Sequence, residues 1–193
     1  MTKLLSHRMV ERGIIKEEEQ ELYQFGIRNG MILLLNVVTA LVIGLLTEQL
    51  AVVAVFTLSF MVLRSYTGGY HSDSRIFCYL GSNLVLLVPV YTQAVFYKTS
   101  LAWLLAVLLV SAGIIFLLSP MHSKNRKLDK EEQKHFGRKA RLIAALELAV
   151  LGILWHAGQI PYAYAVYTGI CITALFMLIG KAQLWIQSHT ENG

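Results

Sequence analysis

The chain has 193 residues, of which 55% are hydrophobic and only 15% charged, and its formal net charge is +5. With a mean hydropathy of +0.55, this composition is typical of an integral membrane protein whose main solvent is lipid, and the length allows one domain. The two cysteines, Cys78 and Cys171, both lie in apolar runs and argue against a disulfide framework.

Residues 1–28 predict one or two amphipathic helices, because five basic and five acidic residues alternate there with apolar ones. Such helices would lie on the membrane surface. A solvated cytoplasmic helix packed on the bundle fits the pattern equally well, and either could dock another amphipathic segment. The segment lacks a continuous apolar core with a cleavage site, so we expect the first apolar run to serve as the membrane signal.

Six apolar runs follow and predict an all-α, polytopic membrane protein with six transmembrane helices. The predicted organisation is a single membrane domain, in which the amphipathic segment precedes a six-helix bundle at 29–180 and a cytoplasmic tail at 181–193. Some runs are shorter than the ~20 residues of a full span, so their ends would borrow polar residues or thin the bilayer. The runs cover residues 30–46, 49–63, 76–96, 101–118, 142–157 and 162–180. Thr47-Glu48-Gln49, at the junction of the first two runs, predicts a tight hairpin turn.

The distribution of positive charge predicts the orientation. If the N-terminus is cytoplasmic, every lysine and arginine except Lys98 falls on the cytoplasmic side. We therefore expect both termini, and the loops at 64–75 and 119–141, at the cytoplasmic face. The basic stretch at 119–141 favours a retention signal or a lipid-headgroup contact over nucleic-acid binding.

The loop between the second and third runs concentrates the chemically active residues. Gly68 and Gly69 allow the chain to end the second run at Leu63 and turn back toward the membrane. Residues 72–74 are all helix-capping types, so a helix should begin near residue 74. Cys78 would then lie in or near the first turn, where unpaired amides and the helix dipole favour a thiolate.

His71 and Cys78 are seven residues apart. A continuous helix would separate them by about 10 Å along its axis, but a loop histidine could fold back to the roughly 3 to 4 Å that nucleophile activation requires. A buried, inert cysteine and a surface histidine are the alternative, and the residues alone leave both open. No metal or other cofactor is expected, because a second His/Cys pair is missing nearby.

Glu147, in the fifth run, is costly in lipid and predicts a functional or paired position. Arg64 and Arg75 are candidate partners, and a protonated structural glutamate is an alternative. A small transporter or channel that uses Glu147, Asn83 and Asn36 is a competing function. A non-catalytic adaptor acting through the amphipathic N-terminus is a third.

The spacing Arg64-x4-Gly69-x-His71-x6-Cys78, with Gly68 before the second glycine, resembles the signature of the accessory gene regulator B family of bacterial quorum-sensing systems. The six runs, the charged N-terminus and the basic loop that opens with Ser119-Pro120 extend the likeness over nearly the whole chain. Many family members have alanine after the histidine, whereas this chain has serine.

The resemblance implies a membrane-embedded cysteine endopeptidase, or thiol protease, in the bacterial cytoplasmic membrane, with its active site at the cytoplasmic face. Its partner would be a short amphipathic signal propeptide (AgrD-like), and a homodimer is also implied. His71 and Cys78 would be catalytic. Arg64, Gly68 and Gly69 would be supporting positions, with the arginine aiding structure or binding an acidic peptide. Asp73 would orient the histidine or cap the helix.

The implied reaction has two steps. His71 accepts the proton of Cys78, and the thiolate attacks a propeptide carbonyl, which releases the C-terminal tail and leaves an acyl-enzyme thioester. A side chain of the peptide then displaces the enzyme thiol and closes a thiolactone or lactone autoinducing peptide. A water-poor pocket would suppress hydrolysis of the thioester.

Overall fold

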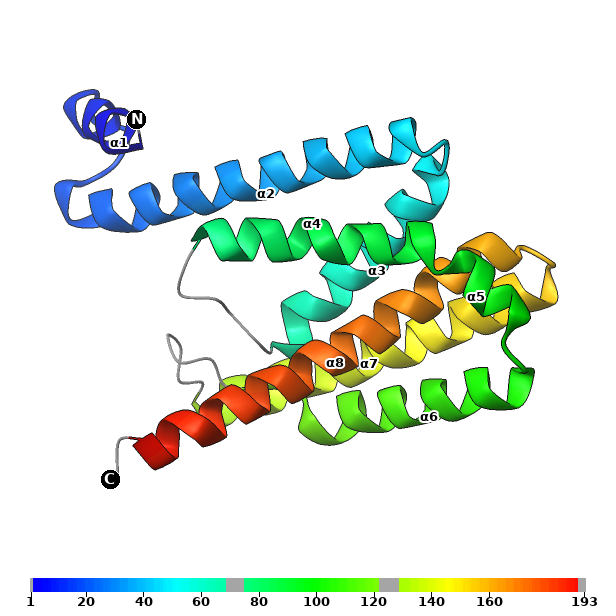
Figure 1. Ribbon diagram of the computed structural model, residues 1–193. Coiled ribbons are helices and arrows are strands. Elements are labelled where there is room, and N and C mark those ends of the chain that lie inside the picture. Colours follow the sequence, from blue (N-terminus) through cyan, green and yellow to red (C-terminus); the bar gives the residue numbers. More distant parts are fainter. Residues whose placement is uncertain (1, 69–74, 122–128, 191–193) are drawn as a thin grey trace. The chain divides into compact units, whose positions relative to one another are not determined.

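The computed structural model of the protein describes residues 2–68, 75–121 and 129–190. Within these ranges the chain is helical and contains no strand, which confirms the predicted all-α class (Figure 1). In chain order the elements are α1 (Thr2–Glu11), the 3₁₀ helix η1 (Glu17–Glu19), α2 (Gln20–Leu46), α3 (Leu50–Thr67), α4 (Arg75–Tyr91), α5 (Gln93–Lys98), α6 (Leu101–Leu118), α7 (Lys130–His156) and α8 (Ile160–Thr190).

Contacts divide the chain into two compact units, Met1–Thr39 and Ala40–Gly193. In the first unit, α1 ends just before Gly13, whose φ of 66° is typical of the glycine that follows a helix. The amides of Gly13 and Ile14 donate to the carbonyls of Val10 and Met9 at 2.8 and 2.9 Å and so satisfy the last turn. The expected helical character of the N-terminal segment is therefore present.

The second unit begins with a tight hairpin between the last turn of α2 and the start of α3. The amide of Gln49 donates to the carbonyl of Gly44 at 2.9 Å. A Cβ on Gly44 would lie 2.8 Å from the Cα of Leu50, so the glycine permits the close approach of the two helices. This arrangement confirms the hairpin expected at Thr47-Glu48-Gln49.

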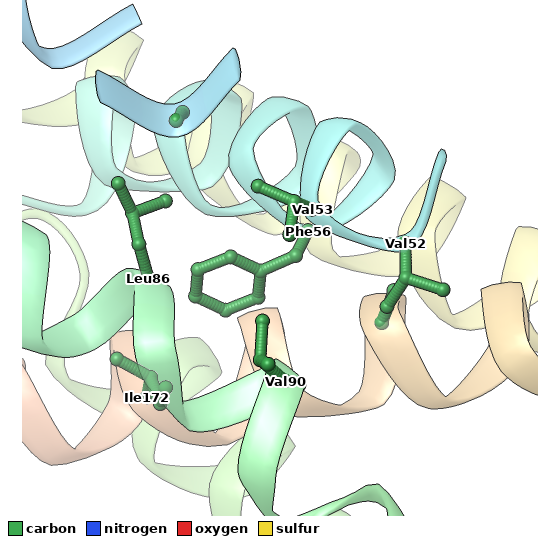
Figure 2. Packing of buried hydrophobic residues seen from close by; sticks show 8 residues of the cluster. Val52, Val53, Phe56, Leu86, Val90 and Ile172 are labelled. Atoms are coloured by element: carbon green, nitrogen blue, oxygen red, sulfur yellow. The ribbon is translucent and has the colours of Figure 1, made fainter. Parts of the chain in front are cut away.

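Helix α8 packs against α3, α6 and α7, and it contributes to both hydrophobic clusters of the second unit. The first cluster joins α3, α4 and α8, and the Phe56 ring lies in it between Leu86 and Val90 (Figure 2). The second joins Leu63 of α3 and Ile115 of α6 to α8, with Ala144 of α7. Alanines and Gly169 along α8 let the neighbouring backbones approach closely.

Four helices of the described chain are long and apolar enough to cross a membrane, which supports a membrane protein but does not show six spans. The third predicted run is divided, because α4 contains Pro89 and ends at Tyr91 before α5 begins. The fifth predicted run is the second half of α7, whose first half is charged. The four candidate spans are Glu17–Leu46, Leu50–Thr67, Leu101–Leu118 and Ile160–Ile186.

Candidate functional site at the end of helix α3

Helix α3 continues one turn beyond Leu63, where the sequence predicted its end, and stops at Thr67. Gly68 follows with a φ of 71° and a ψ of −152°, a combination essentially restricted to glycine. A Cβ at this position would lie 2.7 Å from the carbonyl oxygen of Met121, so a larger residue would also meet the backbone of another segment. The first glycine of the pair is thus the residue at which the chain leaves the helix.

Arg64 closes this turn. Its Nη1 donates a hydrogen bond to the carbonyl oxygen of Gly68 at 3.0 Å, and its guanidinium carbon lies 5.0 Å from the centroid of the Phe176 ring in α8. A planar guanidinium can make both contacts at once, because its edge donates hydrogen bonds while its face stacks on the ring. The side chain therefore joins the end of α3 to α8.

A third contact connects the turn to the segment between α6 and α7. The amide of Met121 donates to the carbonyl oxygen of Thr67 at 2.9 Å, and Thr67 is fully buried. On the other side of this segment, a Cβ on Gly137 of α7 would lie 3.0 Å from Cδ of Pro120. Sequence analysis missed Thr67 and Met121, since a backbone contact between distant segments leaves no local pattern.

Helix α4 is described from Arg75, and Cys78 is its fourth residue in that range, whereas the start predicted near residue 74 lies outside the described residues. The backbone of Cys78 therefore lies in the first turn, where the amides have no partner within the helix. Gly69, His71 and Asp73 lie outside the described residues, and for Cys78 the description is limited to its place in α4. The approach of the imidazole to the thiol stays a prediction.

Glu147 lies on α7 and accepts a hydrogen bond from Oγ of Ser59 on α3 at 2.9 Å. Ser59 in turn lies against Gly169 of α8, where a Cβ would come within 2.5 Å of the serine Oγ. Ser59 is about 12 Å along the axis of α3 from Thr67. Among the described side chains the partner of this carboxyl group is thus Ser59, where the sequence suggested Arg64. The other candidate, the side chain of Arg75, lies outside the description.

Comparison with known proteins agrees with the signature in the loop. A sequence model described as accessory gene regulator B matches residues 2–179. The chain is 24% identical over 148 residues to a putative AgrB-like protein of Clostridium perfringens (strain SM101 / Type A), an alignment that covers 74% of this chain and 69% of that protein. It is 26% identical over 156 residues to the accessory gene regulator protein B of Staphylococcus intermedius, an alignment that covers 79% of this chain and 80% of that protein. No solved structure gives a significant match.

Proposed function

This chain belongs to the accessory gene regulator B family and hence to a regulator family of quorum sensing, and from this premise we propose that it is a membrane-embedded cysteine endopeptidase that cleaves and cyclises a short signal propeptide. The observation that carries the proposal is the place of Cys78 in the first turn of α4. His71, seven residues earlier, supplies the base that the reaction requires.

The start of α4 is suited to a reactive thiol. Amides in the first turn of a helix have no intrahelical acceptor, and the positive end of the helix dipole stabilises a nearby anion. Both effects favour the thiolate, which is the nucleophilic form of cysteine. The same amides are candidates for the oxyanion hole, since they can donate hydrogen bonds to a developing negative charge.

In the proposed first step, His71 removes the thiol proton of Cys78 and the sulfur attacks the carbonyl carbon of the scissile bond. The tetrahedral intermediate collapses as the C–N bond breaks. The imidazolium returns its proton to the leaving amine, and the C-terminal part of the propeptide departs. Its N-terminal part remains on the enzyme as a thioester.

In the second step, a thiol or hydroxyl group within the bound peptide attacks the thioester carbonyl. A new thioester or ester closes the ring, and the Cys78 thiol is released with the proton of the attacking group. Exchange of one thioester for another is nearly balanced in energy, so the enzyme must mainly keep water from the intermediate. A loop flanked by apolar membrane helices favours that exclusion.

Arg64 and Gly68 take supporting roles in this proposal. The glycine provides a backbone conformation that other residues do not adopt, and the arginine holds its carbonyl oxygen. Together they set the direction in which the chain leaves α3 toward His71. Asp73 either orients the imidazole or caps α4. Asparagine caps a helix but carries no charge, so Asp73→Asn should lower processing if the residue orients the imidazole and leave processing unchanged if it only caps the helix.

Processing of a co-expressed propeptide tests the proposal. The full chain is produced in membranes with a candidate short propeptide, and mass spectrometry follows the intact propeptide, its released tail and the cyclic product. We expect processing by the wild type and by Cys171→Ala, and none by Cys78→Ala or His71→Ala. Cysteine 171 provides a matched control, since it is a free thiol in α8.

The same experiment tests the competing transporter function through the variant Glu147→Gln. Because Ser59 gives this carboxyl group a partner within the bundle, we expect the variant to process the propeptide. Processing that persists without Cys78 would remove the protease proposal. A peptide that is cut but retained in Glu147→Gln cells would favour a transport role for that residue.

A further inference from the structure

A cationic pocket of about 520 Å³ lies between the end of α6 and the first half of α7. Lys134, Arg138 and Arg141 contribute its charges, and none of its lining residues is acidic. The predicted orientation puts the pocket at the cytoplasmic face of the membrane. The lining residues are Leu117, Leu118, Ser119, Pro120, Gln133, Lys134, Gly137, Arg138 and Arg141.

The three cations of the pocket lack a carboxylate partner within the part of the chain that the structure describes. The acidic residues Asp129 and Glu132 are engaged in the capping box of α7, where the amide of Glu132 donates to Asp129 Oδ1 at 2.7 Å. Arg141 uses one donor, Nε, on the carbonyl oxygen of Phe116 at 3.1 Å. Since a guanidinium has five donors, this bond fixes the group beside α6 and leaves donors for an anion.

Along the helix axes, the surface beside the pocket changes from cationic to apolar at the same height on α6 and α7. Along one face of α7, Lys134 and Arg138 are followed at the same four-residue spacing by Leu142 and Leu146, which are 61% and 56% exposed. On α6, a candidate span, Leu117 is 83% exposed at the last turn. Exposed leucines on a membrane helix face acyl chains, so the cations lie at the depth of the headgroups.

We propose that this pocket binds the phosphate group of an anionic phospholipid of the cytoplasmic leaflet. Basic pockets between transmembrane helices on that side recognise anionic headgroups, and arginine suits phosphate because it can donate two parallel hydrogen bonds. The acyl chains then lie along Leu117 and Leu142. An acidic peptide would satisfy the charges but would make no use of these leucines, and so a lipid, whose headgroup and acyl chains match both parts, fits the whole surface better.

The site also has a structural connection to the turn at Gly68. Pro120 lines the pocket, and the next residue, Met121, donates its amide to Thr67 at the end of α3. A headgroup held between α6 and α7 would therefore stabilise the segment on which the end of α3 rests. This inference concerns lipid binding alone and does not depend on the proposed peptidase reaction.

Native mass spectrometry of the full chain, released from nanodiscs, tests the proposal with phosphatidylglycerol and phosphatidylcholine as probes. The test variant is Lys134→Gln/Arg138→Gln, which spares the Arg141–Phe116 bond and keeps the variant foldable. Lys98→Gln/Lys181→Gln, at exposed lysines of α5 and α8 that do not line the pocket, is the control with the same loss of charge. We expect the wild type and the control to retain phosphatidylglycerol, and the affinity of the test variant to fall by roughly ten- to thirtyfold.

Competitors identify the kind of anion. Excess inorganic phosphate should leave the lipid bound, because it lacks acyl chains for Leu117 and Leu142, and a soluble glutamate-rich peptide should also fail to displace it. Equal retention by the test variant, an equal loss in the control, or equal retention of phosphatidylcholine would each overturn the proposal. Displacement by phosphate or by the peptide at a concentration matching that of the lipid would assign the pocket to a free anion or a peptide instead.

Discussion

Arg64 and Gly68 are joined by two hydrogen bonds of opposite direction. The amide of Gly68 donates to the carbonyl oxygen of Arg64 at 3.3 Å, and the Arg64 guanidinium donates to the carbonyl oxygen of Gly68 at 3.0 Å. The turn is therefore closed through both the backbone and a side chain. In the proposed enzyme this arrangement determines the path of the chain toward the catalytic histidine.

Replacing Gly68 by alanine or asparagine should lower both stability and propeptide processing. The backbone conformation of Gly68 would cost another residue about 1 to 3 kcal/mol, and a Cβ would meet Met121. Asparagine should not rescue the variant, since it tolerates the left-handed helical region but not a ψ of −152°. Thermal unfolding in detergent and propeptide cleavage measure the two effects.

Gly113→Ala is the matched control, because a Cβ there has no atom within 4 Å and the residue lies inside α6. It should gain up to about 1 kcal/mol from helix propensity and process the propeptide normally. Wild-type stability and activity in Gly68→Ala would show that the turn does not need glycine.

Arg64→Lys should reduce propeptide processing nearly as much as Arg64→Ala. An ammonium group cannot donate to Gly68 and stack on Phe176 with the geometry of a planar guanidinium. A hydrogen bond to a charged group is worth about 1.5 to 3 kcal/mol, so we expect a loss of roughly tenfold or more in the cleavage rate. Phe176→Leu, which removes the ring beside Arg64 and its contact with Phe60 but keeps the hydrogen bond of Arg64 to Gly68, should lose less.

The exposed Arg12 gives the control Arg12→Lys, which should cleave the propeptide at the wild-type rate. Should Arg64→Lys also cleave at that rate while Arg64→Ala does not, the residue would act through its charge, as in binding an acidic peptide. Initial cleavage rates in proteoliposomes distinguish these outcomes.

Ser59→Ala should destabilise the bundle while leaving the chemistry of cleavage intact. It leaves the Glu147 carboxyl group without its partner on α3, at a cost of about 1 to 3 kcal/mol. The double variant Ser59→Ala/Glu147→Ala should lose less than the sum of the two single losses, because both changes remove the same contact. Equilibrium unfolding of the four proteins measures this coupling, and strict additivity would contradict the contact.

Local patterns predicted much of this fold. Gly68 was expected as a turn, and it ends α3. The hairpin after α2 followed from three polar residues between apolar runs. These features depend on the conformational preferences of neighbouring residues, which a sequence displays directly.

Hydrophobicity alone was a weaker guide to where helices end. The second run was expected to stop at Leu63, but α3 continues for one more turn to Thr67. The carbonyls of Arg64 and Thr67 in this turn accept from the amides of Gly68 and Met121. The fifth run belongs to a helix that starts in the basic stretch at Lys130.

Contacts between distant segments could not be predicted. Ser59 carried no signal as the partner of Glu147, and neither Thr67 nor Met121 stood out by residue type. Which helix faces meet depends on the packing of the whole bundle, and in particular on the small residues of α8.

The central claim is that the sulfur of Cys78 carries the acyl group, and the intact mass of the enzyme during turnover tests it most directly. The full chain in proteoliposomes is mixed with propeptide and quenched in acid within the first turnover. The account predicts an adduct with the mass of the N-terminal propeptide fragment, mapped to Cys78, removed by hydroxylamine, present in Cys171→Ala and absent in Cys78→Ala. Cleavage at the wild-type rate by Cys78→Ala, or an adduct on any other residue, would contradict it.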